Sequence, residues 1–261
     1  MLLEPLQYLL GAISGSLVGF TLGLFGGGGS ILAVPLMVYV VGVPVAHVAI
    51  GTSAFAVAAN AATNLVTHAR KGNVIWRCAL MYTVAGVAGA LLGSTLGKAM
   101  DGDKLLFLFA ILMLVVGALM FRGRGNPGIP GATCNREKAP KVLGYGGLTG
   151  AFSGFFVIGG GFLIVPGLVA STGMPILHAI GSSLVAVTAF GLTTALSYAF
   201  SGLVDWPLAA VFIGGGVLGG LVGARVAGMM SSKKGLLNTA FAGLIVLVAI
   251  YMAAKTATAF T

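Results

Sequence analysis

The chain has 261 residues, of which 58% are hydrophobic and only 7% charged, and its mean hydropathy is +1.07. About a quarter of the residues in an ordinary soluble domain are charged, so this composition excludes a mainly soluble protein and predicts one that crosses a membrane several times. The formal net charge of +9 lies in short loops between apolar runs. That pattern is typical of membrane topology and argues against a nucleic-acid-binding protein.

The apolar runs define the expected helices. The sequence before the first run contains no basic residue, so we expect a retained helix there and not a cleaved signal. In chain order, helical segments are expected at about 6–25, 30–42, 46–68, 74–97 and 104–121, and then at about 142–158, 161–173, 177–200, 206–228 and 235–254. Most can span a hydrocarbon core of about 30 Å, but 30–42 and 161–173 are too short and suit half-helices or re-entrant segments.

A run of glycines precedes or opens each short segment. The first copy reads LGLFGGGGSILAVP from Leu22 to Pro35, and the second reads FVIGGGFLIVP from Phe156 to Pro166. Each glycine in a helix costs roughly 1 kcal/mol relative to alanine, so both runs are expected to break a helix inside the membrane. Such a break survives only where protein or a water-filled cavity satisfies the backbone. The alternative is that the glycines only let helices pack closely.

The two halves of the chain are repeats of one unit. At a constant offset, the positions Gly15, Gly19, Gly23, Pro35, Pro44 and His47 match Gly146, Gly150, Gly154, Pro166, Pro175 and His178. After a one-residue gap, Gly51, Ser53 and Trp76 match Gly181, Ser183 and Trp206. We therefore expect a first transmembrane repeat over 1–121, a cytoplasmic linker over 122–141 and a second transmembrane repeat over 142–261. The glycine stripes at helical spacing are expected to be packing faces.

The basic residues predict how each repeat is oriented. One basic loop contains Arg70, Lys71 and Arg77, and its equivalent in the second half carries only Asp205; a second contains Arg225, Lys233 and Lys234, and its equivalent is neutral. Placing these loops and the linker in the cytoplasm accounts for most of the 14 Lys and Arg residues and puts equivalent loops on opposite sides. The expected fold is an all-α integral membrane protein with two inverted repeats of about five helical segments each, broken at the Gly-rich runs. Both termini would then lie outside, and a site at the midplane is expected, as in secondary transporters.

The glycine runs and nearby polar side chains form the candidate substrate site. Amide groups at the start of a half-helix favour an anion, and hydroxyl and carboxamide groups can complete its hydrogen bonds. The expected substrate-binding residues are Gly28, Gly29, Ser30, Ile31, Thr52, Ser53, Asn60, Asn64, Gly159, Gly160, Gly161, Phe162, Ser182 and Ser183. Asn60, Asn64 and His68 lie on one helix face, where hydrogen bonding between helices explains the two asparagines as well as pore lining does. No Asp or Glu falls inside an expected span, which disfavours a proton relay through a buried carboxylate.

Two histidines and two cysteines remain. His47 and His178 occupy equivalent helix starts, so they are candidates for gating or pH sensing, or for simple interfacial residues bonded to the backbone. Cys78 and Cys134 lie far apart with no CxxC spacing, and neither a disulfide nor a metal site is expected. Because no catalytic or nucleotide-binding spacing is present, we expect no enzyme activity and no cofactor.

With these motifs, the chain resembles the sulfite exporter TauE/SafE family of membrane permeases from about Gly11 to Tyr251. The resemblance rests on the paired Gly-rich-to-Pro segments, each followed by a histidine and by Gly51-Thr52-Ser53 or Gly181-Ser182-Ser183. It implies a multi-pass permease or exporter of a bacterial or archaeal inner membrane for a small anion such as sulfite or a sulfonate, for example sulfoacetate. The expected mechanism is alternating access, in which one inverted repeat rocks against the other. An anion channel, or a membrane-embedded assembly partner without transport activity, is the alternative. The second half has Phe190 where the first has Asn60, so a symmetric site is not expected.

Overall fold

The computed structural model describes residues 4–122, 129, 131, 134, 135, 137–156, 161–231 and 236–257. Within these residues the chain is helical and contains no strand, which confirms the all-α fold. The elements are α1 (Pro5–Phe25), η1 (Gly26–Leu32), α2 (Ala33–Pro35), η2 (Leu36–Val40), α3 (Ala46–Arg70), α4 (Trp76–Lys98), α5 (Gly102–Arg122), α6 (Ala139–Phe156), α7 (Gly161–Thr172), α8 (Ile176–Ala199), α9 (Trp206–Ser231) and α10 (Leu236–Ala257). Their bounds lie within a few residues of the expected segments.

Helix length separates full membrane spans from short segments. Within the described residues, α1, α3, α4, α8 and α9 are long and apolar enough to cross a membrane. In contrast, α7 has 12 residues and is therefore only about 18 Å long. The chain between α1 and α3 forms no long α-helix, because it passes through the short elements η1, α2 and η2. Each half thus contains one segment that cannot span the membrane as an α-helix.

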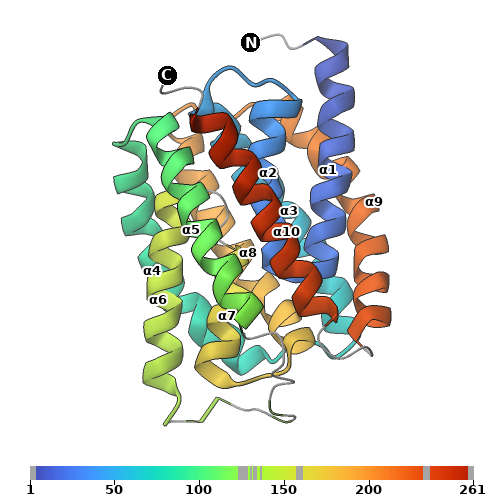
Figure 1. The fold of residues 1–261 in the computed structure, drawn as a ribbon, viewed down its shortest axis with the longest axis vertical. Helices are drawn as coiled ribbons and strands as arrows, with labels where there is room; N and C mark the ends of the chain where they lie inside the picture. Colours follow the sequence, from blue (N-terminus) through green and yellow to red (C-terminus); the bar gives the residue numbers. More distant parts are fainter. Residues whose placement is uncertain are drawn as a thin grey trace.

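Glycine stripes join the first half of the chain to the second. Along α1, Gly11, Gly15, Gly19 and Gly23 face Leu208, Phe212, Gly216 and Gly220 of α9 in the same order, so the two helices run parallel (Figure 1). Helix α4 pairs in the same way with α6, where Gly86 faces Gly150 and Gly93 faces Ala151. At most of these positions an added Cβ would meet backbone atoms of the partner helix. The stripes are packing faces, as expected, and they interleave the two halves.

The long helices form two similar groups. The first bundle consists of α1, α3 and α9, and the second bundle consists of α4, α6 and α8, so each bundle contains helices from both halves of the chain. Helices α3 and α8 meet along the boundary between the bundles. They run antiparallel, because Gly51 lies against Tyr198 whereas Ala58 lies against Gly191. Exchanging the two halves of the chain exchanges the two bundles.

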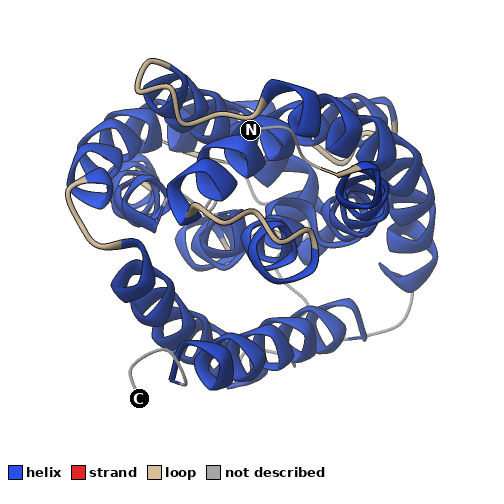
Figure 2. Cartoon of the chain, turned by 90° about the horizontal axis from the view of Figure 1, so that it is seen from above, coloured by secondary structure: helices blue, strands red, loops and turns tan. Residues whose placement is uncertain are grey.

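Helices α5 and α10 form a separate layer. They pack mainly against each other and lie along one side of the molecule, which Figure 2 shows from above. Aromatic residues attach the layer to the rest: the Phe25 and Phe241 ring centroids are 5.3 Å apart, and Phe109 lies 5.5 Å from Phe162. This layer therefore covers the region where α1 ends and α7 begins.

Basic residues gather at one end of the molecule, the lower end in Figure 1. There, Lys71 Nζ donates to the Ala224 carbonyl near the end of α9 at 2.9 Å, and Lys138 Nζ donates to the Thr172 carbonyl at the end of α7 at 2.9 Å. Helix α1 begins and α10 ends at the opposite end (Figure 1). The first basic loop thus lies beside the end of α9.

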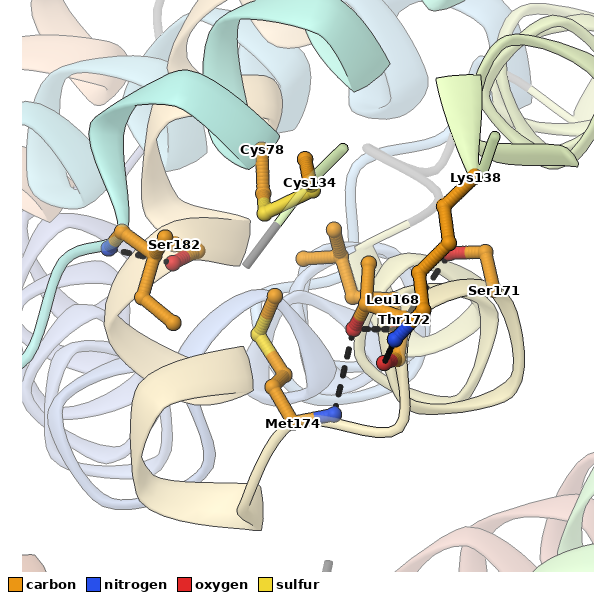
Figure 3. Close-up of a disulfide and its surroundings, with 9 residues drawn as sticks. Cys78, Cys134, Lys138, Leu168, Ser171, Thr172, Met174 and Ser182 are labelled. Carbon is orange, nitrogen blue, oxygen red and sulfur yellow. Dashed lines mark hydrogen bonds between the residues drawn. A yellow bond between two sulfur atoms is a disulfide. The ribbon is translucent and has the colours of Figure 1, made fainter. Parts of the chain in front are cut away.

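The expectation that Cys78 and Cys134 do not form a disulfide is wrong. Cys78 lies in the first turn of α4 and Cys134 in the linker, and their sulfur atoms are bonded across a sequence separation of 56 residues (Figure 3). The bond is possible because α6 packs alongside α4, which brings the linker before α6 beneath the start of α4. The spacing of the two cysteines along the sequence could not reveal this contact.

Candidate functional site

The first glycine run ends an α-helix, as predicted. Helix α1 stops at Phe25, and Gly26 has φ +62°, a left-handed conformation that favours glycine. The short helical segment expected after the glycines is present, because Ser30–Val40 forms an apolar helix too short to span a membrane. Its winding is irregular: residues Gly26–Leu32 form a 3₁₀ helix, and a single α-turn and a π-type turn lead on to Val40. Glycines tolerate this tighter winding, which leaves their amides differently placed from those of a regular α-helix start.

The second glycine run lies between two helices. Helix α6 ends at Phe156 and α7 begins at Gly161. The predicted site residues Gly159 and Gly160 fall outside the described residues. Phe162, the second residue of α7, is buried and packs its ring against Phe109 of α5. Its side chain therefore faces the α5–α10 layer.

The two glycine runs meet. A Cβ placed on Gly27 would lie 2.7 Å from the carbonyl oxygen and 2.8 Å from the Cα of Gly161. A Cβ on Gly161 would in turn collide with the backbone carbonyl of Gly27. Real Cβ atoms do not approach backbone atoms so closely, so only glycine fits at either position. We call the contact between Gly27 and Gly161 the crossing. Gly27 also lies against Val187, close to the middle of α8, so the crossing lies well inside the helical bundle.

Ser183 holds the first glycine run in place. Its hydroxyl accepts a hydrogen bond of 3.0 Å from the Gly27 amide and donates one of 2.7 Å to the Ile180 carbonyl. The equivalent Ser53 donates in the same way to the Ile50 carbonyl at 2.9 Å. Ser183 therefore already binds an amide of the first glycine run. An anion that accepted a hydrogen bond from the Gly27 amide would have to displace the Ser183 hydroxyl.

Replacing Ser183 by alanine is expected to leave the Gly27 amide buried without a partner. The expected cost is about 1–3 kcal/mol of folding free energy, because an unsatisfied buried donor loses its desolvation energy uncompensated. Thermal unfolding of the purified protein in detergent measures it. Thr193→Ala is the control, since the Thr193 hydroxyl bonds only the Ala189 carbonyl of its own helix at 2.8 Å. Equal stability of the two variants would contradict the bridging role of Ser183.

Thr52 and Ser182 occupy equivalent positions in the two halves and accept equivalent hydrogen bonds. Thr52 Oγ1 accepts from the Asp205 amide, the residue before α9, at 2.9 Å, and Ser182 Oγ accepts from the Ile75 amide, the residue before α4, at 2.9 Å. Each hydroxyl therefore anchors the start of a long helix from the other half of the chain. Both side chains are fully buried. Contact between these hydroxyls and a substrate stays a prediction.

Asn60 and Asn64 lie between α3 and α9. Asn64 Nδ2 donates to the Asn60 carbonyl at 2.9 Å, and its Oδ1 would lie 2.7 Å from a Cβ on Gly220. Asn60 is fully buried against Gly216, and neither its Oδ1 nor its Nδ2 has a hydrogen-bond partner within the described part of the chain. A buried carboxamide without partners is costly and calls for a ligand or solvent. Hydrogen bonding between helices, the alternative expected for Asn60, is not seen among the described residues.

His68 continues the polar face of α3 toward the basic end. Its Nε2 lies 2.9 Å from the Gly23 carbonyl and its Nδ1 lies 3.3 Å from Asn73 Nδ2. The carbonyl can only accept, so Nε2 carries the proton and Nδ1 accepts from the amide of Asn73. His68 therefore joins the end of α3 to the end of α1. The equivalent residue in α8 is Tyr198, which is also buried.

His47 and His178 lie in the first turns of α3 and α8, at opposite ends of the molecule because these helices are antiparallel. The His47 ring is 6.3 Å from that of Tyr198. In both histidines Nδ1 is buried and has no hydrogen-bond partner within the described residues. A backbone bond through Nδ1 is thus not seen among the described residues, and both the interfacial interpretation and the gating role stay predictions.

The remaining predicted residues belong to the crossing itself. Gly28, Gly29, Ser30 and Ile31 are part of η1, where Ser30 Oγ donates to the Gly27 carbonyl at 2.8 Å and Ile31 is fully buried. The residue that sequence reasoning missed is Gly27, which contacts both Gly161 and Ser183. Nothing in a run of four glycines distinguishes one member from the next, so the sequence held no signal for it.

Apolar helices interrupted at two touching glycine runs define a multi-pass membrane protein. The chain belongs to the sulfite exporter TauE/SafE family, whose profile matches residues 11–252. It is 53% identical over 247 residues to a probable membrane transporter protein of Xylella fastidiosa, covering 92% of each chain. It is 27% identical to the probable membrane transporter protein YdhB of Bacillus subtilis, covering 88% of this chain and 96% of that one. No solved structure matches. The protein is thus a membrane transporter.

Proposed function

We propose that this transporter carries a small anion, sulfite or an organosulfonate such as sulfoacetate, across the inner membrane of a bacterium or archaeon by alternating access. The observation that carries the proposal is the crossing of the two broken segments at Gly27 and Gly161, deep between the two bundles. Broken helices that meet at the centre of a bundle expose amides to a bound ion, which intact helices do not. The family name adds sulfite as the first substrate to test.

Inversion of the repeats is part of this proposal. It is supported by the antiparallel contact of α3 with α8, which are equivalent helices. The pair of α1 with α9 and the pair of α6 with α4 are also equivalent, since exchanging the two halves of the chain converts one pair into the other. Two copies of one unit related by a twofold axis in the membrane plane would have these contacts. By the positive-inside rule the basic end is cytoplasmic, so both termini would lie outside.

The chemistry of the crossing favours an anion. Its described polar groups include the Gly27 amide and the hydroxyls of Ser30 and Ser183, all of which can donate a hydrogen bond. The carboxamide of Asn60, another buried donor, lies between α3 and α9. The acidic residues Glu4, Asp101, Asp103, Glu137 and Asp205 occupy positions at helix ends or in the linker, away from the crossing. Hydrogen-bond donors with no carboxylate nearby can bind an oxyanion, whereas a cation at this place would have no negative charge to balance it.

Because helices from both halves are interleaved, their contacts determine which groups of helices can move relative to each other. Rocking one repeat against the other would separate α1 from α9 and α4 from α6, whose backbones are in contact at glycines. In our proposal the two bundles move instead, because their boundary consists of α3, α8 and the two broken segments. Ser30, Ser53 and Ser183 are all buried, so a substrate reaches them only when this boundary opens.

Anion flux into proteoliposomes tests the proposal. We expect saturable uptake of sulfite or sulfoacetate by the purified protein, competed by the other anion, and no macroscopic conductance in planar bilayers. Unsaturable flux with single-channel currents would show an anion channel that uses the same site. No flux of sulfite, sulfonates, sulfate or carboxylates, together with a second subunit that copurifies, would overturn the proposal in favour of an assembly partner.

A further inference from the structure

The disulfide between Cys78 and Cys134 fastens the linker to the basic end of the molecule. Both cysteines are buried, with relative exposures of 0% and 1%. Two backbone contacts continue the attachment: the Ile129 amide donates to the Gly173 carbonyl at 2.7 Å, and Lys138 Nζ donates to the Thr172 carbonyl at 2.9 Å. Figure 3 shows the sulfur pair beside the turn between α7 and α8. The linker thus connects the start of α4 to the end of α7.

The surroundings of this bond conflict with a permanent disulfide. It lies at the end of the molecule that holds Lys71 and Lys138, where the basic residues indicate the cytoplasm. Disulfides are stable in oxidising compartments, whereas cytosolic thiol systems keep protein thiols reduced, and cytosolic disulfides are mostly transient or redox-sensing. Gly131 and Asn135, close to Cys134 in the linker, are exposed, so local lifting of this loop brings Cys134 to solvent.

We propose that Cys78 and Cys134 form a reversible redox site, a latch that closes under oxidising conditions and fastens the linker, which contacts the end of α7, to the start of α4. When a low-molecular-weight disulfide is the oxidant, the Cys134 thiolate attacks one of its sulfur atoms and releases one thiol. The Cys78 thiolate then displaces the second thiol, which gives the Cys78–Cys134 bond. Two electrons and two protons pass to the oxidant, and a dithiol reductant of the thioredoxin class reverses both steps.

Because the disulfide lies near the end of α7, we expect its redox state to affect transport. Helix α7 carries Gly161 at its other end, where the two broken segments cross. The start of α4 is also held by Ser182 of α8 through the Ile75 amide. With the disulfide closed, the linker is bonded covalently to α4 and contacts the end of α7 through two hydrogen bonds, and with it open only the hydrogen bonds hold the linker there. The effect on transport rests on the proposed function, whereas the redox site rests only on the cytoplasmic orientation of the basic end.

The state of the cysteines in cells tests the site directly. Growing cells that produce the full chain are quenched in acid, and free thiols are labelled with a maleimide that adds mass. We expect the thiol form in growing cells, conversion to the disulfide within minutes of adding diamide, and return to the thiol form when diamide is removed. A pair that stays oxidised throughout, or that stays reduced under diamide, would overturn the proposal.

Two measurements on the purified protein test the latch. Reduction is expected to speed tryptic cleavage within residues 122–141, and to raise sulfoacetate flux in proteoliposomes, each by about tenfold. Sulfoacetate is the probe because sulfite itself cleaves disulfides. Cys78→Ser and Cys134→Ser are matched controls that should behave alike, as the reduced protein does, under both conditions. Redox sensitivity that persists in either variant, or equal cleavage of the oxidised and reduced protein, would contradict the latch. If no anion is transported, the proposed function fails while cleavage and thiol labelling still decide the redox site.

Discussion

Replacing Gly161 by alanine is expected to lower anion flux about tenfold or more and to destabilise the protein by about 1–3 kcal/mol, the usual cost of overpacking a tight contact. The added methyl group would collide with the backbone carbonyl of Gly27, and backbone atoms cannot move aside as the end of a flexible side chain can. The two broken segments would be forced apart at the proposed substrate site. Flux is measured in proteoliposomes at equal amounts of folded protein.

Gly144→Ala is the matched control for Gly161→Ala. Gly144 lies in α6, and an added Cβ there would have no neighbour within 4 Å. This variant should keep wild-type flux, with a stability equal to or slightly above that of the wild type, because alanine favours a helix more than glycine does. If Gly161→Ala transported as well as Gly144→Ala does, the crossing of the glycine runs would not be the substrate site.

A covalent link between α3 and α8 is expected to stop transport almost completely. A Cβ on Gly191 would lie 2.9 Å from the Cβ of Ala58, close enough for a disulfide after a small relaxation. The test variant carries Ala58→Cys and Gly191→Cys, with Cys78→Ser and Cys134→Ser to remove the native bond. Oxidation should abolish flux because the link crosses the boundary between the bundles, and dithiothreitol should restore it. Flux is compared before and after reduction in the same proteoliposomes.

A link inside the first bundle is the control for this experiment. A Cβ on Gly11 would lie 2.8 Å from Leu208 Cδ1, so Gly11→Cys with Leu208→Cys joins α1 to α9. In our proposal these helices move together, and oxidation should leave flux unchanged. The opposite pattern, with flux lost on linking α1 to α9 and kept on linking α3 to α8, would mean that the two repeats move as separate bodies.

Much of the fold follows from the sequence because the membrane restricts what a chain can do. Runs of apolar residues long enough to cross the hydrocarbon core have to be helices, and the short run that begins at Gly161 could not be a full span. Glycines at helical spacing, such as Gly15 and Gly19, predicted close packing. The end of α1 at Phe25 also follows locally, since four glycines come next.

Partners across the molecule did not follow from the sequence. A glycine stripe indicates that a helix packs closely but does not identify the other helix, so the pairing of α1 with α9 could not be predicted. The same limit applies to Cys78 and Cys134, whose contact depends on where α6 lies. For the candidate site, Ser183 was expected to touch a ligand because it is a buried hydroxyl. Its bond to the Gly27 amide could be found only once α8 and η1 were placed together.

The interleaving of helices from both halves also affects the order in which the helices can pack during synthesis. Helix α1 leaves the ribosome well before α9, yet the face formed by Gly15, Gly19 and Gly23 packs against α9. In a bilayer, helices insert first and associate afterwards. For most of translation α1 therefore has only lipid or a temporary neighbour beside that face, and its final docking waits for α9. A nascent chain cut short before α9 would leave this glycine face of α1 without the partner that it has in the complete fold.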